Sequence, residues 1–373
     1  MIYLDNAATT PVSEEVISEM HRILSEVHGN PSSIHIQGRK AKLEIDESRK
    51  KIATYLNVNP QCVIFTSGGT EANNFAIKGV AKSMHKKGRH IITSRIEHAS
   101  ILETCKALEN EGYEVTYINV HQDGTVDIDQ LEKEIRPDTI LISIMHANNE
   151  VGAVNNIEEI HKICKKNNTL FHIDAIQSFG KIDILDTYDF LSLSAHKIHG
   201  PKGIGALVIL DKSKINALLD GGHQEFGLRS GTQNVSGIVG FGKAVEIISD
   251  TDSVSMQKIK NFLWQSLANV PNVVLNSTAN NCLPNILNIS FLGVSGQELV
   301  MQLSRQGIMF STGSACSSSN NKHSHVLASM GKSEDEMSSS IRLSLSRYTS
   351  IEDAIHARDA IIKTVNKLLI LSQ

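Results

Sequence analysis

Short apolar runs alternate with helical segments through residues 63–210, and each run ends in polar residues. The runs lie at residues 63–65, 91–93, 140–144, 170–173 and 190–193. Strands that alternate with helices form a mostly parallel sheet. Ligands bind such a sheet in the crevice beyond the carboxyl ends of its strands. The pattern therefore predicts an α/β fold in which the polar residues after the strands meet at one edge.

The polar residues just past these runs are the first candidates for a site. They are Thr70, His98, Asn149, Asp174, Gln177 and Lys197. Residues 66–74 read as a strand end, a glycine turn and a helix start, which aims backbone N–H groups at an anion. The G-K-[ST] ending of a P-loop is missing. A phosphate site is predicted here, with a plain strand-to-helix turn as the alternative.

Lys197 lies in a polar, glycine-rich loop, residues 192–205, between two apolar runs. A desolvated lysine loses its charge easily and becomes the nucleophilic amine that a Schiff base requires. Ser194 and His196 offer hydrogen bonds to a phosphate beside it. The alternative is a surface loop that carries two lysines and two histidines.

A crevice with a phosphate-binding turn, an imidazole, a carboxylate and a lysine suits pyridoxal 5'-phosphate (PLP). Asp174 follows an apolar run, so it suits the buried anionic partner of the pyridinium nitrogen, and a helix cap is the alternative. His98 is placed to stack on the cofactor ring. A hydrogen-bonded core histidine is the alternative for that position.

Two further residues point to chemistry in the last quarter of the chain. Residues 309–323 are rich in serine, asparagine and glycine, which predicts an exposed, mobile loop. Cys316 in this loop is placed to react and to move, unless it is an accidental surface thiol. Residues 340–346 alternate as a strand does, and Arg342 in it can clamp a carboxylate. A surface strand charge is the alternative.

Two turn-rich segments complete the set of candidates. Asn30 lies in residues 28–33, and its amide can bind a carboxylate, although a plain helix-to-helix connection is the simpler interpretation. Residues 227–234 resemble a second anion-binding turn, which acts within the chain or across a dimer.

Length and composition bound the remaining possibilities. A chain of 373 residues predicts two domains, with the main boundary at the polar residues 250–255. The net charge is −4 and no run of Lys or Arg stands out, so direct nucleic-acid binding is not indicated. No apolar stretch is long enough for a membrane span, and no targeting signal is seen. Five cysteines without a C-x-x-C pair predict a reducing, cytoplasmic setting with no disulfide framework and no zinc site.

Taken together, the motifs resemble one family from end to end. They lie at residues 4–10, 28–33, 67–71, 97–98, 148–152, 174–177, 194–197, 229–232 and 313–316. The chain resembles the cysteine desulfurases of the NifS/IscS type, in the class V aminotransferase group of fold-type I PLP enzymes. The resemblance implies a large α/β PLP-binding domain, residues 13–255. It also implies a smaller α+β domain, residues 1–12 and 256–373, that carries the cysteine loop.

The resemblance also implies the roles of the residues around the cofactor. Lys197 would hold PLP as a Schiff base and later move the Cα proton of the substrate. Asp174 would pair with the pyridinium nitrogen, and Gln177 with the phenolic oxygen. Asn149 would lie at the same ring edge and near the substrate. His98 would stack on the ring and assist proton transfers.

The remaining implied roles concern the phosphate, the substrate and the sulfur. The phosphate would be held by Gly69, Thr70, Ser194, His196 and, from the partner subunit of a homodimer, Thr232. Arg342, with Asn30, would grip the carboxylate of L-cysteine. Cys316 would attack the sulfur of the bound cysteine, and the products would be alanine and a persulfide on Cys316. No resident metal is expected, although Cys316 would be able to contact a nascent iron–sulfur cluster during transfer.

The sulfur leaves cysteine as a formal cation equivalent, so the group that receives it must be a soft thiolate.

Alternatives remain open for the sulfur acceptor and for the reaction. The sulfur acceptor is an iron–sulfur scaffold or a tRNA-thiolating enzyme. A selenocysteine lyase or a related PLP lyase or transaminase is a second interpretation, and a catalytically dead partner-binding homologue is a third.

Overall fold

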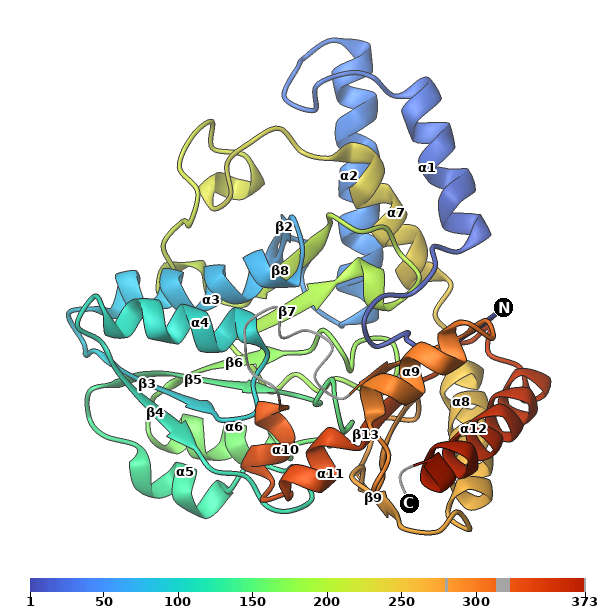
Figure 1. The fold of residues 1–373 in the computed structure, drawn as a ribbon. Coiled ribbons are helices and arrows are strands. Elements are labelled where there is room, and N and C mark those ends of the chain that lie inside the picture. Colours follow the sequence, from blue (N-terminus) through green and yellow to red (C-terminus); the bar gives the residue numbers. More distant parts are fainter. Residues whose placement is uncertain (279–280, 313–322, 372–373) are drawn as a thin grey trace.

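The computed structural model describes residues 1–278, 281–312 and 323–371. Its largest element is a seven-stranded sheet (Figure 1). In spatial order the strands are β2 (Val63–Thr66), β8 (Gly205–Ile209), β7 (Phe190–Ser194), β6 (Leu170–Asp174), β5 (Thr139–Met145), β3 (His90–Ser94) and β4 (Glu114–Ile118). The two pairings made by β8 are antiparallel and the other four are parallel. The predicted mostly parallel sheet is therefore confirmed, with β8 alone running in the opposite direction.

Helices cover both faces of this sheet because its strands are apolar on both sides. They are α1 (Glu14–Glu26), α2 (Ile36–Tyr55), α3 (Gly69–Met84), α4 (Ala99–Glu109), α5 (Ile128–Glu134), α6 (Ile157–Lys166) and α7 (Val235–Glu246). Leu207 of β8 belongs to the apolar cluster that includes residues of α3 and α4, whereas Val208, the next residue, belongs to the cluster that includes residues of α2, α6 and α7. Successive strand residues point to opposite faces, so one strand supplies both cores.

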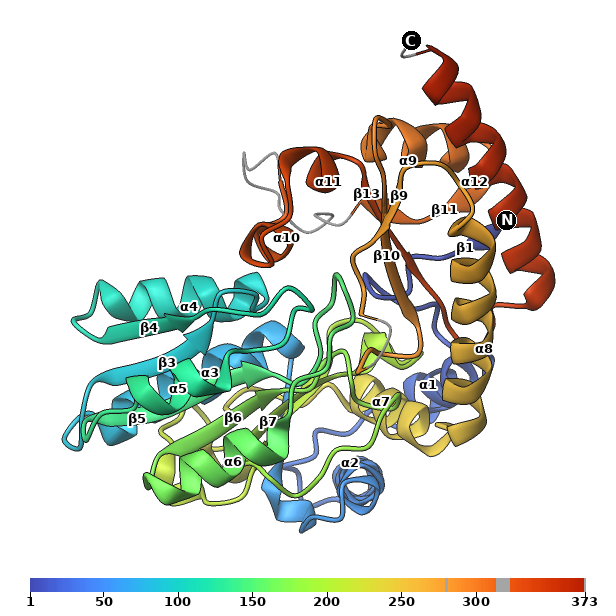
Figure 2. The same cartoon turned by 90° about the horizontal axis from the view of Figure 1, so that it is seen from below.

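A smaller, antiparallel sheet stands beside the first (Figure 2). Its order is β12 (Ser311–Thr312), β13 (Ser340–Ser344), β10 (Ile286–Phe291) and β9 (Val273–Leu275). A separate parallel pair joins β1 (Ile2–Tyr3) to β11 (Ile308–Met309). The helices of this part are α8 (Asp250–Leu267), α9 (Gly296–Ser304), α10 (His325–Ser329), α11 (Glu334–Ser338) and α12 (Ile351–Leu371).

One bound differs from the expectation that residues 250–255 separate the domains. Helix α8 begins at Asp250, because these polar residues form its first turns. Acidic side chains such as Asp250 and Asp252 are favourable at a helix N-terminus. Helix α2 begins at Ile36, where the side chain of His35 caps it by accepting from the backbone N–H of Gly38.

We propose that residues 13–255 and residues 1–12 with 256–373 form the two domains. Leu4 supports this division, because it is buried in the same apolar cluster as Met256, Leu287 and Leu343. No helix within the residues that the structure describes has an apolar stretch long enough to cross a bilayer.

Candidate active site

The carboxyl ends of β2, β6 and β7 meet at one edge of the large sheet. Ser194 at the end of β7 pairs with Gly205, which also pairs with Thr66 at the end of β2. A Cβ on Gly205 would lie 2.7 Å from the backbone carbon of Gly68, so the turn after β2 packs directly against this strand. Asp174 at the end of β6 pairs with Ser192 of β7. These strand ends therefore lie together, as the sequence pattern predicted.

Asp174 is a buried carboxylate with several donors around it. Its Oδ1 accepts from the backbone N–H of Ile176 at 2.9 Å, and its Oδ2 accepts from the Asn73 amide at 2.8 Å. Burial raises the pKa of Asp174, although these hydrogen bonds and the nearby charges of His98 and Lys197 act in the opposite direction. A buried carboxylate of this kind is stabilised by a cation placed against it.

Lys197 lies in the short 3-10 helix η2 (Ala195–Lys197) that follows β7. Its Nζ donates to the carbonyl oxygens of Ala7 at 2.6 Å and Ala8 at 2.8 Å. The carbonyl of Ala7 also accepts from Nε2 of Gln177 at 2.9 Å. The N-terminal segment therefore closes over the lysine. Sequence reasoning missed these carbonyls, and the run of small residues at 6–10 was the signal that the backbone approaches closely here.

The turn after β2 carries the features of an anion site. Helix α3 begins at Gly69, and its N-cap, Gly68, has φ 153° and supplies no side-chain cap. Thr70 is exposed in the first turn of α3. The hydroxyl of Ser194 is buried and has no hydrogen-bond partner within the described part of the chain. Uncapped helix N–H groups and an unsatisfied hydroxyl are the donors that a phosphate would take.

The side chains of His196 and Glu71 lie beside this turn, and each is held by a hydrogen bond or an ion pair. Nδ1 of His196 lies 3.1 Å from the hydroxyl of Thr9. Burial, followed by the charge of Lys197, lowers the pKa of His196 to about 4, so its ring is neutral near pH 7. Glu71 accepts from the backbone N–H of Ser67 at 2.7 Å and pairs with Arg229 at 2.8 Å, which braces the turn.

His98 is the N-cap of α4 and partly buried. Its Nδ1 accepts from the backbone N–H of Ser100 at 3.1 Å and lies 2.9 Å from the Ser100 hydroxyl. Burial lowers the pKa of His98, which Asp174 partly offsets. The ring is therefore fixed by its own helix and is neutral at physiological pH.

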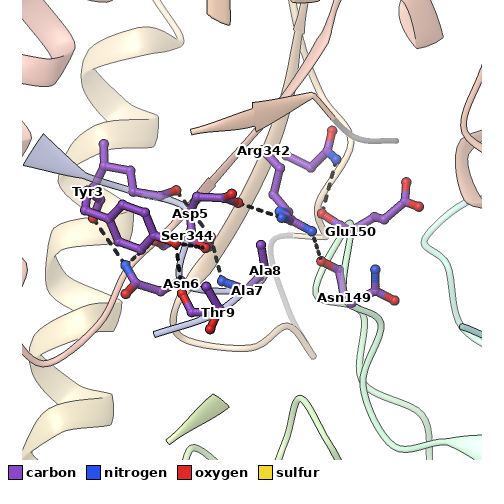
Figure 3. Close-up of polar contacts among 12 residues, drawn as sticks. Tyr3, Asp5, Asn6, Ala7, Ala8, Thr9, Asn149, Glu150, Arg342 and Ser344 are labelled. Carbon is purple, nitrogen blue, oxygen red and sulfur yellow. Dashed lines mark hydrogen bonds and ion pairs between the residues drawn. The ribbon is translucent and has the colours of Figure 1, made fainter. Parts of the chain in front are cut away.

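Arg342 is a second cation that contacts the N-terminal segment, and its side chain reaches both Asp5 and Asn149 (Figure 3). Only 1% of Arg342 is exposed. The alternative of a surface charge is therefore wrong. Its Nη1 donates to the carbonyl oxygen of Asn149 at 2.9 Å, and its Nη2 donates to Oδ1 of Asp5 at 2.8 Å. Its Nε is buried and has no partner within the described residues. Sequence reasoning did not identify Asp5 as the counter-ion.

Two predicted site residues, Asn30 and Thr232, lie outside this cluster, and a third, Cys316, is not among the described residues. Asn30 is exposed in the connection between α1 and α2, and its Oδ1 accepts from the backbone N–H of Ser32. Thr232 is exposed in the segment between β8 and α7. The neighbours of both residues, Ser32 and Gln233, line one groove of about 360 Å³. Cys316 falls in residues 313–322, outside the part of the chain that the structure describes.

The fold and this lysine-bearing edge define a PLP-type α/β enzyme of the class-V aminotransferases. The family described as "Aminotransferase class-V" matches residues 2–355, and the chain belongs to it. Within that family it is a full-length homologue of the IscS/NifS-type cysteine desulfurases.

The similarity is high at the level of both sequence and structure. The cysteine desulfurase IscS of Dictyoglomus turgidum is 45% identical over 378 residues, which cover 100% of this chain and 96% of that protein. A structure described as a NifS-like protein superposes with a TM-score of 0.93 at 40% identity, over 98% of this chain and 99% of that one. A structure of SspA in complex with cysteine gives a TM-score of 0.84 at 40% identity, over 94% of this chain and 100% of that one.

Proposed function

We propose that this cysteine desulfurase homologue holds PLP at the edge formed by β2, β6 and β7. On this proposal it converts L-cysteine to L-alanine and leaves a persulfide on Cys316. The observation that carries the proposal is the unsatisfied buried hydroxyl of Ser194 beside the uncapped start of α3, with Lys197 and Asp174 at the same edge. Those groups fit a phosphate, an aldehyde and a ring nitrogen. When bound, PLP supplies the electron sink for the reaction.

Different residues would bind different parts of the cofactor. Lys197 would hold it covalently through its amine, which must first leave the carbonyls of Ala7 and Ala8. Asp174 would stabilise the protonated ring nitrogen, and Gln177 would hold the phenolic oxygen. The buried Oε1 of Gln177 has no partner among the described residues, so its amide has capacity for a ligand.

Other residues would hold the phosphate of the cofactor and the carboxylate of the substrate. The phosphate ligands would be Gly69, Thr70, Ser194 and His196. Arg342 would bind the substrate carboxylate next to Asn149, whose carbonyl already anchors the guanidinium. His98 would lie against the ring as a neutral imidazole.

The sulfur step needs a nucleophile that is soft and near the substrate. The Cys316 thiolate would form a sulfur–sulfur bond while the carbon–sulfur bond of cysteine breaks. The electron pair of the broken bond stays with the substrate carbon, which takes up a proton to become alanine. Lys197, once released from the cofactor, is the amine that moves the proton at Cα. The structure of SspA with cysteine supports this substrate class, since the chain is 40% identical to SspA.

We further propose a homodimer in which Thr232 and Asn30 serve the site of the other subunit. Both residues are exposed and border one groove, apart from the site of their own chain. Large apolar side chains are exposed on the same elements, with Ile34 at 92% and Ile36 at 75%. Burying each such side chain would contribute about 1.5–3 kcal/mol. Exposed apolar patches mark interaction surfaces.

For the sulfur acceptor we propose a class of protein. The persulfide would pass to an acceptor protein, either an iron–sulfur scaffold or a tRNA-thiolating enzyme. A cytoplasmic setting agrees with the free thiols of Cys62, Cys105, Cys164 and Cys282.

Mass spectrometry tests the proposal directly. After incubation with L-cysteine, the holoenzyme should gain sulfur on Cys316, and borohydride should fix the cofactor to Lys197. Cys316→Ser should abolish both sulfur loading and alanine formation. Alanine formation that survives in Cys316→Ser would instead favour a lyase or transaminase. A protein that binds no PLP would favour a partner-binding homologue.

A further inference from the structure

Asn73, a residue of α3, links two groups of the site, Asp174 at the end of β6 and His98 at the start of α4. It is completely buried. Its side-chain nitrogen lies 2.8 Å from Oδ2 of Asp174 and 2.9 Å from the hydroxyl oxygen of Ser100. That hydroxyl in turn lies 2.9 Å from Nδ1 of His98. A continuous line of hydrogen bonds therefore joins the carboxylate to the imidazole.

The direction of each hydrogen bond in this line follows from the chemistry of its members. An amide nitrogen has two hydrogens and accepts nothing, so Asn73 donates to both neighbours. The opposite orientation of its amide would set an oxygen against the Asp174 carboxylate. Since the Ser100 hydroxyl accepts from Asn73, its own hydrogen is free to point at His98.

Nδ1 of His98 therefore faces two donors, the hydroxyl and the backbone N–H of Ser100. A nitrogen that accepts carries no proton, so the neutral ring holds its hydrogen on Nε2. Protonation of Nδ1 would set donor against donor. The charged or titratable groups around His98 are Asp174 on β6, Lys197 on η2 and His325 on α10. Burial lowers the pKa of His98 and agrees with a neutral ring.

We propose that Asn73 is a positioning residue that fixes Asp174 and, through Ser100, the Nε2–H tautomer of His98. The inference rests on the proposed PLP site, because Asp174 and His98 are the two groups expected against the cofactor ring. A neutral His98 can lie against a protonated ring that an imidazolium would repel. Asn73 thus acts through Asp174 and His98, by holding the carboxylate of one and the tautomer of the other.

Two variants of the full-length chain separate the two effects. Asn73→Leu has a similar volume and no donor, so it should weaken PLP binding roughly tenfold and raise the pKa of His98 by about one unit. Ser100→Ala keeps the contact between Asn73 and Asp174. It should raise the pKa of His98 by a similar amount and change the dissociation constant for PLP less than twofold.

The measurements are ¹⁵N NMR of histidine, before and after loading with PLP, and a fluorescence titration with PLP. Asn276→Leu is the matched control. Asn276 is also buried, and its nitrogen also donates twice, to Asn288 and Ser290 in the smaller sheet. Its removal should lower stability and leave the His98 signals in place.

A His98 ring with its proton on Nδ1 in the unaltered chain would overturn the proposal. So would a Ser100→Ala variant in which the pKa of His98 does not move, and this test holds even if Asn73→Leu fails to fold. The NMR of the chain without cofactor is independent of the proposed function. Failure to bind PLP at all would refute that function and leave the His98 result to be judged by itself.

Discussion

The buried guanidinium of Arg342 in β13 forms an ion pair with the partly exposed carboxylate of Asp5, with Nη2 and Oδ1 2.8 Å apart. The pair joins residues 337 positions apart in the chain. The cation proposed to bind the substrate carboxylate therefore already holds one anion. A substrate carboxylate would be its second, close to the first.

Asp5→Asn should change stability and substrate binding in opposite directions. It leaves Arg342 as a buried cation without its counter-ion, so the melting temperature should fall. It also removes a negative charge near the incoming carboxylate. The KM for L-cysteine should therefore fall by roughly three- to tenfold, the effect of about 1 kcal/mol of repulsion.

Asp46→Asn is the control, because Asp46 pairs with Lys42 on the surface of α2. It should leave both quantities unchanged. A KM that rises in Asp5→Asn would mean that the carboxylate serves only to orient the guanidinium.

Ser194→Ala should affect the cofactor and not the fold. The hydroxyl has no partner in the described part of the chain, so its loss costs the PLP-free protein no hydrogen bond. The melting temperature without PLP should stay level or rise, and the dissociation constant for PLP should increase roughly tenfold. Ser192→Ala is matched, since Ser192 is in the same strand and bonds to His172. It should lower the melting temperature and spare PLP binding.

Glu97→Gln should flatten the dependence of stability on pH. Glu97 is fully buried, and burial raises its pKa from 4.5 to about 8. The folded chain keeps this proton where the unfolded chain has lost it, so the unfolding free energy falls as the pH rises. From about pH 5 to about pH 8 this fall amounts to roughly 3–4 kcal/mol.

Glutamine is neutral at every pH and keeps an oxygen for the hydroxyl of Ser94 and the backbone N–H of Met145. Urea titrations at both pH values would measure the slope. An unchanged pH dependence in Glu97→Gln would show that Glu97 is ionised in the folded protein.

Arg49 and Glu225 form an ion pair in which both side chains are buried, and this pair holds a strained segment. Two hydrogen bonds join them at 2.8 and 2.9 Å, and Glu225 also accepts from the backbone N–H of Phe65. Glu225 and Phe226 have φ of 47° and 60°, which favour glycine. Glu225→Gln should lower the unfolding free energy by about 3–5 kcal/mol, because it leaves a buried cation.

A double-mutant cycle with Arg49→Met should show strong coupling, with the double variant less destabilised than the sum of the two single ones. Additive effects would mean that the ion pair makes no direct contribution.

Ile34→Glu with Ile36→Glu should dissociate the proposed dimer. The charges would be buried against apolar surface, which is unfavourable. Light scattering should show a monomer, and PLP binding should weaken because Thr232 of the partner subunit is lost from the site. Leu185→Glu is the control, an exposed apolar residue on the segment between β6 and β7. A dimer that survives the double change uses another surface.

Sequence reasoning predicted the parts of the site that depend on local pattern. The apolar run before Asp174 and the one before Lys197 define strands by themselves, and neighbouring parallel strands end at one edge. Partners far apart in the chain carry no such signal. Asp5 lies in a short polar segment that only folding brings to Arg342, and Asn73 lies 101 positions from Asp174. The polar residues 250–255 are interpreted from the sequence as a break between domains, but they form the start of helix α8. Polarity alone does not separate the two, because acidic residues are also well suited to a helix N-terminus.

The pairing of β1 with β11, and of Asp5 with β13, has a consequence for biosynthesis. A ribosome makes residues 2–5 long before residues 308–344, so for most of translation the partners of β1 and Asp5 in β11 and β13 do not yet exist. The carbonyls of Ala7 and Ala8, which bind Lys197, follow directly after this segment in the chain. The nascent chain is therefore expected to complete its candidate site late, once Arg342 has been made and can pair with Asp5.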